Sequence, residues 1–147
     1  MDSGERDDLV KRFATLGSTT IEPKKSSVAE VKQNSIYDVV KSKIGLPGVY
    51  VIRTLCGDAV WIGETEKIWE RMYCHIHCFH DSNLIWALAC SKHFPQYKDN
   101  PNFLKKEVEC FLVEFVVIKE GRKRRRAVEK FTDNQLRPYS PLLLNRR

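Results

Sequence analysis

The stretch GVYVIRTLCGDAVWIG, residues 48–63, decides the fold. Two short runs of apolar and β-branched side chains, at 49–52 and 59–62, flank a polar segment, which is the pattern of two antiparallel strands. The Gly-Asp pair at 57–58 is typical of the turn between such strands. Gly63 ends the second strand, and the chain then turns helical. The pattern predicts a β-hairpin that leads directly into a helix.

The size and charge of the chain limit the class of protein. Its 147 residues suit a single domain with a hydrophobic core of its own. Lys and Arg outnumber Asp and Glu by 25 to 19, which gives a net charge of +6. A positive charge of this size favours an anionic partner, although it says nothing about the fold. Much of the excess lies in residues 122–126 and in the last two residues.

The cysteines and the hydropathy pattern indicate a cellular compartment. Five cysteines occur at no spacing typical of disulfides, and no signal peptide is recognisable. No apolar run approaches the roughly 18 residues of a membrane span. These features predict a soluble, intracellular protein, cytoplasmic or nuclear, whose thiols stay free in a reducing compartment and which does not bind a membrane.

The N-terminal 45 residues divide into two parts. Residues 1–25 are polar and lack periodicity, so we expect a flexible arm. The segment 26–45 opens on a capping box at 27–30 and carries a loose apolar stripe. This stripe predicts an extra N-terminal helix over about 28–43 that packs on the following domain.

The rest of the chain contains several helical patterns and one more strand. A β-branched and aromatic run at 109–118 predicts a third, central strand. Periodicity and capping residues predict helices at 65–79, 84–90, 102–106 and 124–136. The tail after Pro138 is expected to be extended, with a leucine run that must pack against the domain.

The hairpin also carries a recognisable pair of tripeptides. Gly48-Val49-Tyr50 is followed, after ten intervening residues, by Trp61-Ile62-Gly63. This pair resembles the signature of the GIY-YIG nuclease family. The sequence departs from that signature at Trp61, where the family has tyrosine. An indole keeps the ring and an N–H donor but has no ionisable hydroxyl.

Four residues downstream strengthen the resemblance because they follow in the family's order and spacing. Arg71 stands eight residues beyond the glycine of the second tripeptide, and His75 lies one helical turn later on the same face. Glu129 lies in the last predicted helix, and Asn145 follows in a proline-containing tail. The resemblance covers about residues 46–147, which are identified as a GIY-YIG-like nuclease domain.

The fold class that the resemblance implies is α+β. The sheet would be small, mainly antiparallel and three-stranded, with helices on both faces. Hairpin strands would supply Tyr50 and Trp61, supported by Gly48 and Gly63 at the strand ends. The N-terminal helix would be an elaboration of this unit.

The resemblance also implies the chemistry of each residue. Tyr50 would act as general base or orient the attacking water, and His75 would take the proton onward. A free phenol has a pKa near 10, so cationic neighbours such as Arg71 or a metal would have to lower it. Arg71 would also contact the phosphate, Glu129 would hold one Mg²⁺ or Mn²⁺ ion, and Asn145 would hydrogen-bond within the site.

A basic run is the second candidate binding element. It consists of Arg122, Lys123, Arg124, Arg125 and Arg126. Such a run is often a solvated surface or a nuclear-localisation signal. Here the cations begin a helix, where the macrodipole disfavours them. That cost favours a nucleic-acid phosphate as their partner.

The segment 74–80 is a third candidate because it is rich in cysteine and histidine. Cys74 and Cys78 share a helix face, and Cys90 and His93 form another group. A zinc site is conceivable, but the sequence has no CxxC pair, so buried cysteine is the favoured interpretation.

The leading functional hypothesis is a divalent-metal-dependent endonuclease that hydrolyses phosphodiester bonds in DNA rather than RNA. The alternative is a nucleic-acid-binding module of the same fold, with chemistry weakened or lost through Trp61. A third hypothesis is a zinc-stabilised interaction protein. Cutting both strands would require a homodimer or two successive visits, and targeting would come from this domain, the arm or a protein partner.

Overall fold

The computed structural model describes residues 34–145. In chain order its elements are β1 (Asn34–Ser35), α2 (Ile36–Ser42), β2 (Gly48–Arg53), β3 (Ala59–Thr65), α3 (Ile68–His77), α4 (Leu84–Cys90), the 3₁₀ helix η2 (Pro95–Tyr97), α5 (Pro101–Glu109), β4 (Leu112–Val117), α6 (Arg122–Leu136) and the 3₁₀ helix η3 (Arg137–Tyr139). The predicted α+β class is confirmed. None of the helices within residues 34–145 is long and apolar enough to cross a membrane.

The sheet has four strands in the order β1-β4-β2-β3, and every neighbouring pair is antiparallel. The predicted hairpin and third strand are present, and β4 lies inside the sheet as expected. The prediction of three strands was wrong by one, because β1 pairs Asn34 with Val113 and Ser35 with Leu112. Two polar residues carry no alternating pattern, so their sequence could not reveal a strand.

The N-terminal helix begins later than its sequence pattern suggested. Ser35 is extended, and its hydroxyl accepts a hydrogen bond from the Asp38 backbone N–H at 3.0 Å, which makes Ser35 the N-cap of α2. The helix therefore spans Ile36–Ser42, and Asn34 and Ser35 are not helical. The capping box at 27–30 and the rest of the predicted helix before residue 34, like the predicted arm, lie outside the described residues.

Other boundaries moved by a few residues. The second hairpin strand continues past Gly63 to Thr65, because Thr65 still pairs with Gly48 on β2. The next helix consequently starts at Ile68 instead of residue 65. The helix α4 has the predicted bounds, whereas α5 and α6 extend beyond theirs.

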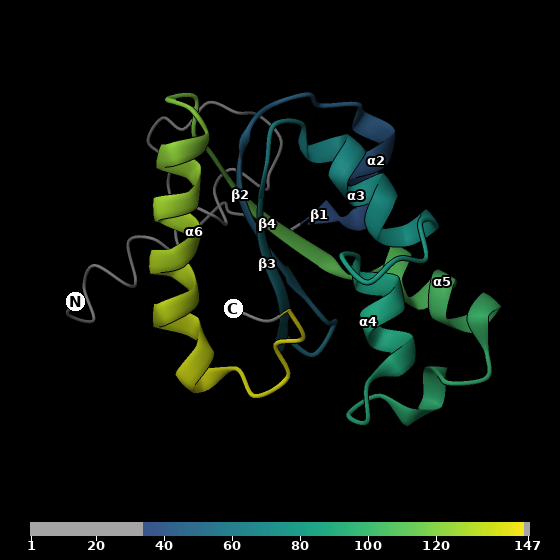
Figure 1. The fold of residues 1–147 in the computed structure, drawn as a ribbon. Helices are drawn as coiled ribbons and strands as arrows, with labels where there is room; N and C mark the ends of the chain where they lie inside the picture. The colour runs from purple at the N-terminus through teal and green to yellow at the C-terminus, as the bar shows by residue number, and fades with distance from the viewer. Residues whose placement is uncertain (1–33, 146–147) are drawn as a thin grey trace.

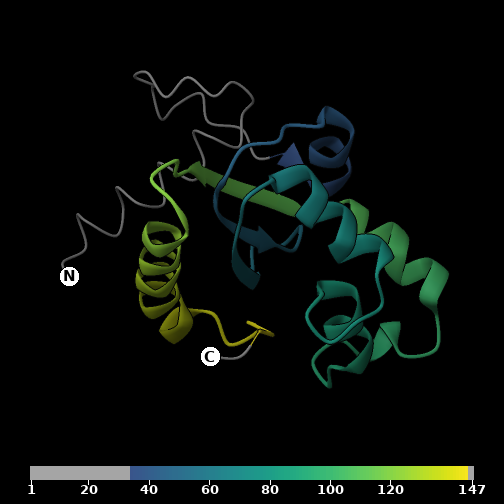
Figure 2. The same ribbon diagram turned by 45° about the horizontal axis from the view of Figure 1, so that its top comes forward.

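Helices cover both faces of the sheet (Figures 1 and 2). On one face, α6 packs Val128 and Phe131 against Val49, Val51 and Val116 of the strands. On the other face, the larger core joins the sheet to α2, α3, α4 and α5. Because successive strand residues point to opposite faces, Tyr50 enters the larger core while its neighbours Val49 and Val51 face α6.

The C-terminal tail runs along the outer edge of β3. The Leu144 N–H donates to the Val60 carbonyl at 2.9 Å. The Asn145 side chain accepts from the Ile62 N–H at 3.3 Å and donates to the Ile62 carbonyl at 2.5 Å. The Arg137 guanidinium in turn donates to the Asn145 carbonyl at 2.9 Å. The tail therefore satisfies backbone groups that an edge strand would otherwise leave open.

Candidate functional site

Glycine is required at both ends of the hairpin for packing reasons. Gly63 lies opposite Tyr50 in the β2–β3 register, and a Cβ at Gly63 would overlap the Tyr50 phenol ring. At the other end, a Cβ at Gly48 would overlap the Val116 carbonyl oxygen and the Phe115 ring. The two glycines predicted as supporting residues therefore let an aromatic ring lie flat against a neighbouring strand. Gly63 in particular fixes where the Tyr50 hydroxyl sits.

Three of the predicted site residues meet at the Tyr50 hydroxyl. The Tyr50 Oη lies 2.8 Å from His75 Nε2, and the Arg71 Nε–H donates to it at 3.4 Å. The His75 Nδ1 accepts a hydrogen bond from the Leu84 backbone N–H at 2.8 Å. A neutral imidazole that accepts at Nδ1 carries its proton on Nε2, so His75 donates to Tyr50. The phenol oxygen therefore faces two N–H donors.

Burial sets the charge state of this pair. Tyr50 is 1% exposed and His75 is fully buried. Burial raises the pKa of Tyr50 to about 12, although the charge and hydrogen bond of Arg71 act to lower it. Burial, together with the positive charge of Arg71, holds the pKa of His75 well below its usual 6.5. Near neutral pH both groups are therefore uncharged in this structure.

The structure bears on two of the expected roles. Arg71 was expected to lower the pKa of Tyr50, but loss of hydration in the closed site outweighs that effect. His75 was expected to take the proton from Tyr50. Its one acceptor nitrogen is occupied by the Leu84 N–H, so the geometry makes His75 a hydrogen-bond donor to the phenol instead.

Trp61 packs against one side of this cluster. Its side chain is 6% exposed, and its ring meets the His75 ring edge-on with centroids 5.1 Å apart. A hydrogen bond from the Trp61 side chain also acts to lower the pKa of Tyr50. The only donor of that side chain is the indole N–H. The indole thus packs against the His75 ring, and its N–H acts to lower the pKa of Tyr50.

Glu129 also acts on this site, although it lies far from Tyr50 in the sequence. It lies on α6, is half-buried, and its negative charge acts to raise the pKa of Tyr50. The structure therefore brings the predicted metal ligand within electrostatic range of the phenol. A single carboxylate is a suitable ligand for a Mg²⁺ ion that keeps several waters.

Asn145 is placed differently from the other predicted site residues. Its side-chain amide is paired with the backbone of Ile62, one residue along β3 from Trp61. Its direct contacts are therefore with the edge strand. In this position Asn145 holds the C-terminal tail against β3, the strand that carries Trp61 and Gly63.

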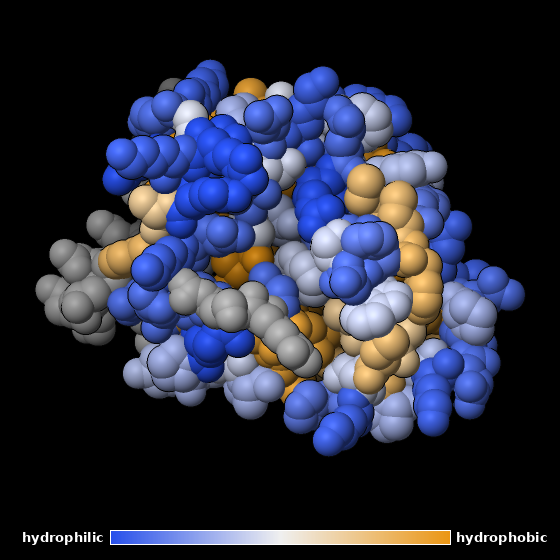
Figure 3. All heavy atoms as spheres, viewed as in Figure 1, coloured by the Kyte–Doolittle hydropathy of each residue, from blue (hydrophilic) through white to orange (hydrophobic). Residues whose placement is uncertain are grey.

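The basic run at the start of α6 is not a uniform surface. Arg125 is buried, and its Nε lies 2.9 Å from a carboxylate oxygen of Glu64. A buried, paired guanidinium cannot contact a nucleic acid, so Arg125 is removed from the predicted binding set. The exposed members are Arg122, Lys123, Arg124 and Arg126. Hydrophilic side chains accordingly cover the surface over the first half of α6 (Figure 3).

Cys74 lies on α3, and Cys78 is the C-cap residue of that helix. Within residues 34–145 no group of three or more His, Cys, Asp or Glu side chains could hold a metal ion. Cys74 and Cys78 lie close to each other, and burial with a hydrogen bond between them raises the pKa of the Cys74 thiol. Both cysteines are partly buried and neither lies in the hydrophobic core, so the interpretation as buried cysteine is not confirmed.

The sequence interpretation missed the polar loop between α3 and α4. Asn83 was expected to cap a helix, but its side chain accepts a hydrogen bond from Arg71 at 2.8 Å instead. The Ser82 carbonyl accepts a second one from Arg71 at 2.6 Å. The available signal was the Asp-Ser-Asn cluster before α4, which also fits an ordinary helix cap.

Comparison with known proteins adds no relative. Neither a family model, nor a curated protein, nor a solved structure matches this chain. What defines the site is consequently its own geometry. An α+β domain holds a tyrosine, a histidine and an arginine in one hydrogen-bonded cluster, with a glutamate carboxylate in electrostatic range.

Proposed function

We propose that the protein is a divalent-metal-dependent endonuclease of the GIY-YIG type that hydrolyses phosphodiester bonds in DNA rather than RNA. The observation that carries this proposal is the pair of N–H donors at the Tyr50 oxygen, from His75 and Arg71. An oxygen surrounded by donors is better hydrogen-bonded as a phenolate than as a phenol. These donors act against the burial that raises the pKa of Tyr50, and in this way they support a role for Tyr50 as a base.

Glu129 is the residue that would hold the divalent ion, Mg²⁺ or Mn²⁺. Such an ion, when bound, offsets the carboxylate charge that raises the pKa of Tyr50 and balances the charge of a scissile phosphate. Arg71 has five N–H groups, three of which are engaged within the protein. The remaining two are suited to a phosphate oxygen. Tyr50 would then orient the attacking water, and it would accept the water's proton as a phenolate, after releasing its own proton to solvent.

Plasmid cleavage with Mg²⁺ or Mn²⁺ tests the proposal, with RNA as the second substrate. Tyr50→Phe keeps the buried ring and removes only the hydroxyl, so it is the matched variant for the base. We expect it to lower the cleavage rate about 100-fold or more. We expect Glu129→Gln to abolish metal-dependent cleavage at unchanged fold. Cleavage that survives Glu129→Gln would show that the metal is held elsewhere.

One observation favours a second function. The Tyr50 side chain is almost fully buried and its pKa is about 12, so in this structure the base is neither charged nor open to water. A nucleic-acid-binding module of the same fold, using exposed cations such as Lys123 and Arg126, is consistent with that state. Salt-dependent DNA binding without cleavage by the unaltered protein, in either metal, would favour this function over the first.

A further inference from the structure

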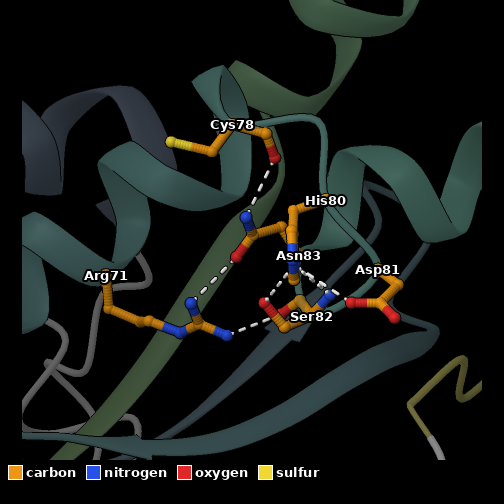
Figure 4. A network of polar contacts seen from close by, with 6 residues as sticks. All are labelled: Arg71, Cys78, His80, Asp81, Ser82 and Asn83. Atoms are coloured by element: carbon orange, nitrogen blue, oxygen red, sulfur yellow. Dashed lines mark hydrogen bonds and ion pairs between the residues drawn. The ribbon is translucent and has the colours of Figure 1, made fainter.

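The loop between α3 and α4, residues 78–83, is joined to the proposed site by side-chain hydrogen bonds (Figure 4). The Arg71 Nη1 donates to the Asn83 Oδ1 at 2.8 Å, and its Nη2 donates to the Ser82 carbonyl at 2.6 Å. The Asn83 Nδ2 donates to the Cys78 carbonyl at 2.9 Å. The Asn83 amide therefore bridges the arginine and the end of the preceding helix.

Asn83 occupies a helix N-cap position but does not cap the helix. Its backbone is extended, with φ −122° and ψ 151°, and its side chain makes no capping hydrogen bond. The N–H of Leu84, the first residue of α4, is bound separately by His75 Nδ1. Asparagine at an N-cap ordinarily accepts a hydrogen bond from a backbone N–H in the first turn of the helix. This side chain makes no such bond and accepts from Arg71. His75 and Arg71 are therefore both held at the start of α4, His75 by Leu84 and Arg71 by Asn83.

The Asn83 amide has a single consistent orientation. The residue is 4% exposed, and each end of its amide has a partner. A guanidinium offers only donors, so the amide oxygen must face Arg71. The amide nitrogen then faces the Cys78 carbonyl, which can only accept. In this orientation the amide oxygen and the amide nitrogen of Asn83 both have a partner. If the amide were flipped, neither would have one.

We propose that Asn83 is a positioning residue for Arg71, which rests on the proposed nuclease function. An arginine side chain has several freely rotating bonds and loses entropy when it is fixed. Asn83 and the Ser82 carbonyl fix the Nη atoms, and this aims the Nε–H at the Tyr50 oxygen. The two N–H groups left over keep a defined direction for the scissile phosphate.

The absence of charge on the Asn83 amide matters for Arg71, as well as the position of its hydrogen-bonding atoms. An aspartate at position 83 would keep an acceptor for Arg71 but would place a carboxylate against the Cys78 carbonyl oxygen. Its charge would also offset the guanidinium charge that acts on Tyr50 and on a phosphate. Asn83→Asp is therefore the matched variant for charge, and Asn83→Ala is the variant for loss of contact.

A double-mutant cycle in the cleavage assay tests whether Asn83 acts through Arg71. We expect Asn83→Ala to lower kcat about 100-fold with a smaller change in KM. In an Arg71→Ala background, the same change should have no further effect. The loop control is Asp81→Ala, since Asp81 is exposed, pairs with His80 at 3.0 Å and points away from Arg71 (Figure 4). An equal loss from Asn83→Ala in both backgrounds would overturn the proposal.

An NMR measurement decides the question without cleavage. The Arg71 Nε–H signal should be slow to exchange in the unaltered protein and in Asp81→Ala, and it should broaden or be lost in Asn83→Ala. If Asn83→Ala does not fold, Asn83→Asp provides the comparison, with the signal kept and kcat lowered. An unchanged Nε–H signal in folded Asn83→Ala would overturn the positioning role. Absence of cleavage by the unaltered protein, with this NMR pattern intact, would overturn only the nuclease function.

Discussion

Mild acid should destabilise this protein through one buried histidine. His75 is fully buried, accepts from the Leu84 N–H and donates to the Tyr50 oxygen. Burial and the nearby charge of Arg71 hold its pKa well below 6.5. An unfolded chain lacks that environment, so its histidine takes up a proton near pH 6.5. The two states therefore differ by a proton in mildly acidic solution.

The size of the effect follows from that single proton. Because the pKa of His75 is lowered in the folded state, its contribution is fully present above pH 6.5 and is lost as the pH falls. The slope approaches about 1.4 kcal/mol per pH unit while only the unfolded chain is protonated. Between pH 7 and pH 5 the free energy of unfolding should fall by about 2 kcal/mol from this group.

Urea denaturation at several pH values between 7 and 5 measures this loss. The matched variant is His75→Gln, because a glutamine can accept from Leu84 and donate to Tyr50 without ever titrating. We expect the slope over this range to be much flatter in His75→Gln. His77→Gln is the control for a neighbour whose pKa is lowered less and which lies exposed on the same helix.

Two results would refute the reasoning. One is an identical pH slope in the unaltered protein and in His75→Gln. The other is an NMR titration of the folded protein in which His75 takes up its proton near pH 6.5. Either would mean that the imidazole is hydrated or reversed, so that Nδ1 does not accept from Leu84.

The remaining predictions concern packing and charge. Gly63→Ala places a methyl group against the buried Tyr50 ring, so it should lower the free energy of unfolding by about 1–3 kcal/mol, measured by urea denaturation. That loss should shrink when Tyr50 is replaced by Leu, and an equal loss in both backgrounds would contradict the overlap. Arg125→Ala removes the closer of two cationic partners of the Glu64 carboxylate, the other being Arg122 at 3.7 Å, and should cost about 1–3 kcal/mol. Arg126→Ala, an exposed neighbour, should stay within about 0.5 kcal/mol while weakening DNA binding in a salt-dependent assay. Equal stability losses for the two arginines would contradict the buried pair.

The hairpin and α4 were predictable because their signals are local. Two continuous apolar and β-branched runs around a Gly-Asp turn indicate two strands, and a short run that is apolar almost all round indicates α4. The strand β1 was not predictable in this way. Its pairing depends on β4, almost eighty residues further along the chain, and its own two residues are polar.

Part of the candidate site was predictable from the sequence, but the protonation of its residues was not. Spacing alone placed Arg71 and His75 on one face of a helix, and the structure brings both to Tyr50. What spacing could not give is burial, which decides the pKa of Tyr50 and makes His75 a donor. A charge run likewise cannot show which arginine turns inward, because the partner of Arg125 is Glu64 on a distant strand.

The tail along β3 has a consequence for self-association. An open strand edge offers unpaired N–H and C=O groups to a second molecule, which is a common route to aggregation. Here the outer edge of β3 is occupied by Leu144 and Asn145, and the opposite edge is β1, only two residues long. A chain truncated before residue 142 should therefore form intermolecular β-pairs on storage, which size-exclusion chromatography and thioflavin fluorescence would detect. Leu144 and Asn145 thus occupy backbone groups of β3 that a second copy of the chain would otherwise be able to pair with.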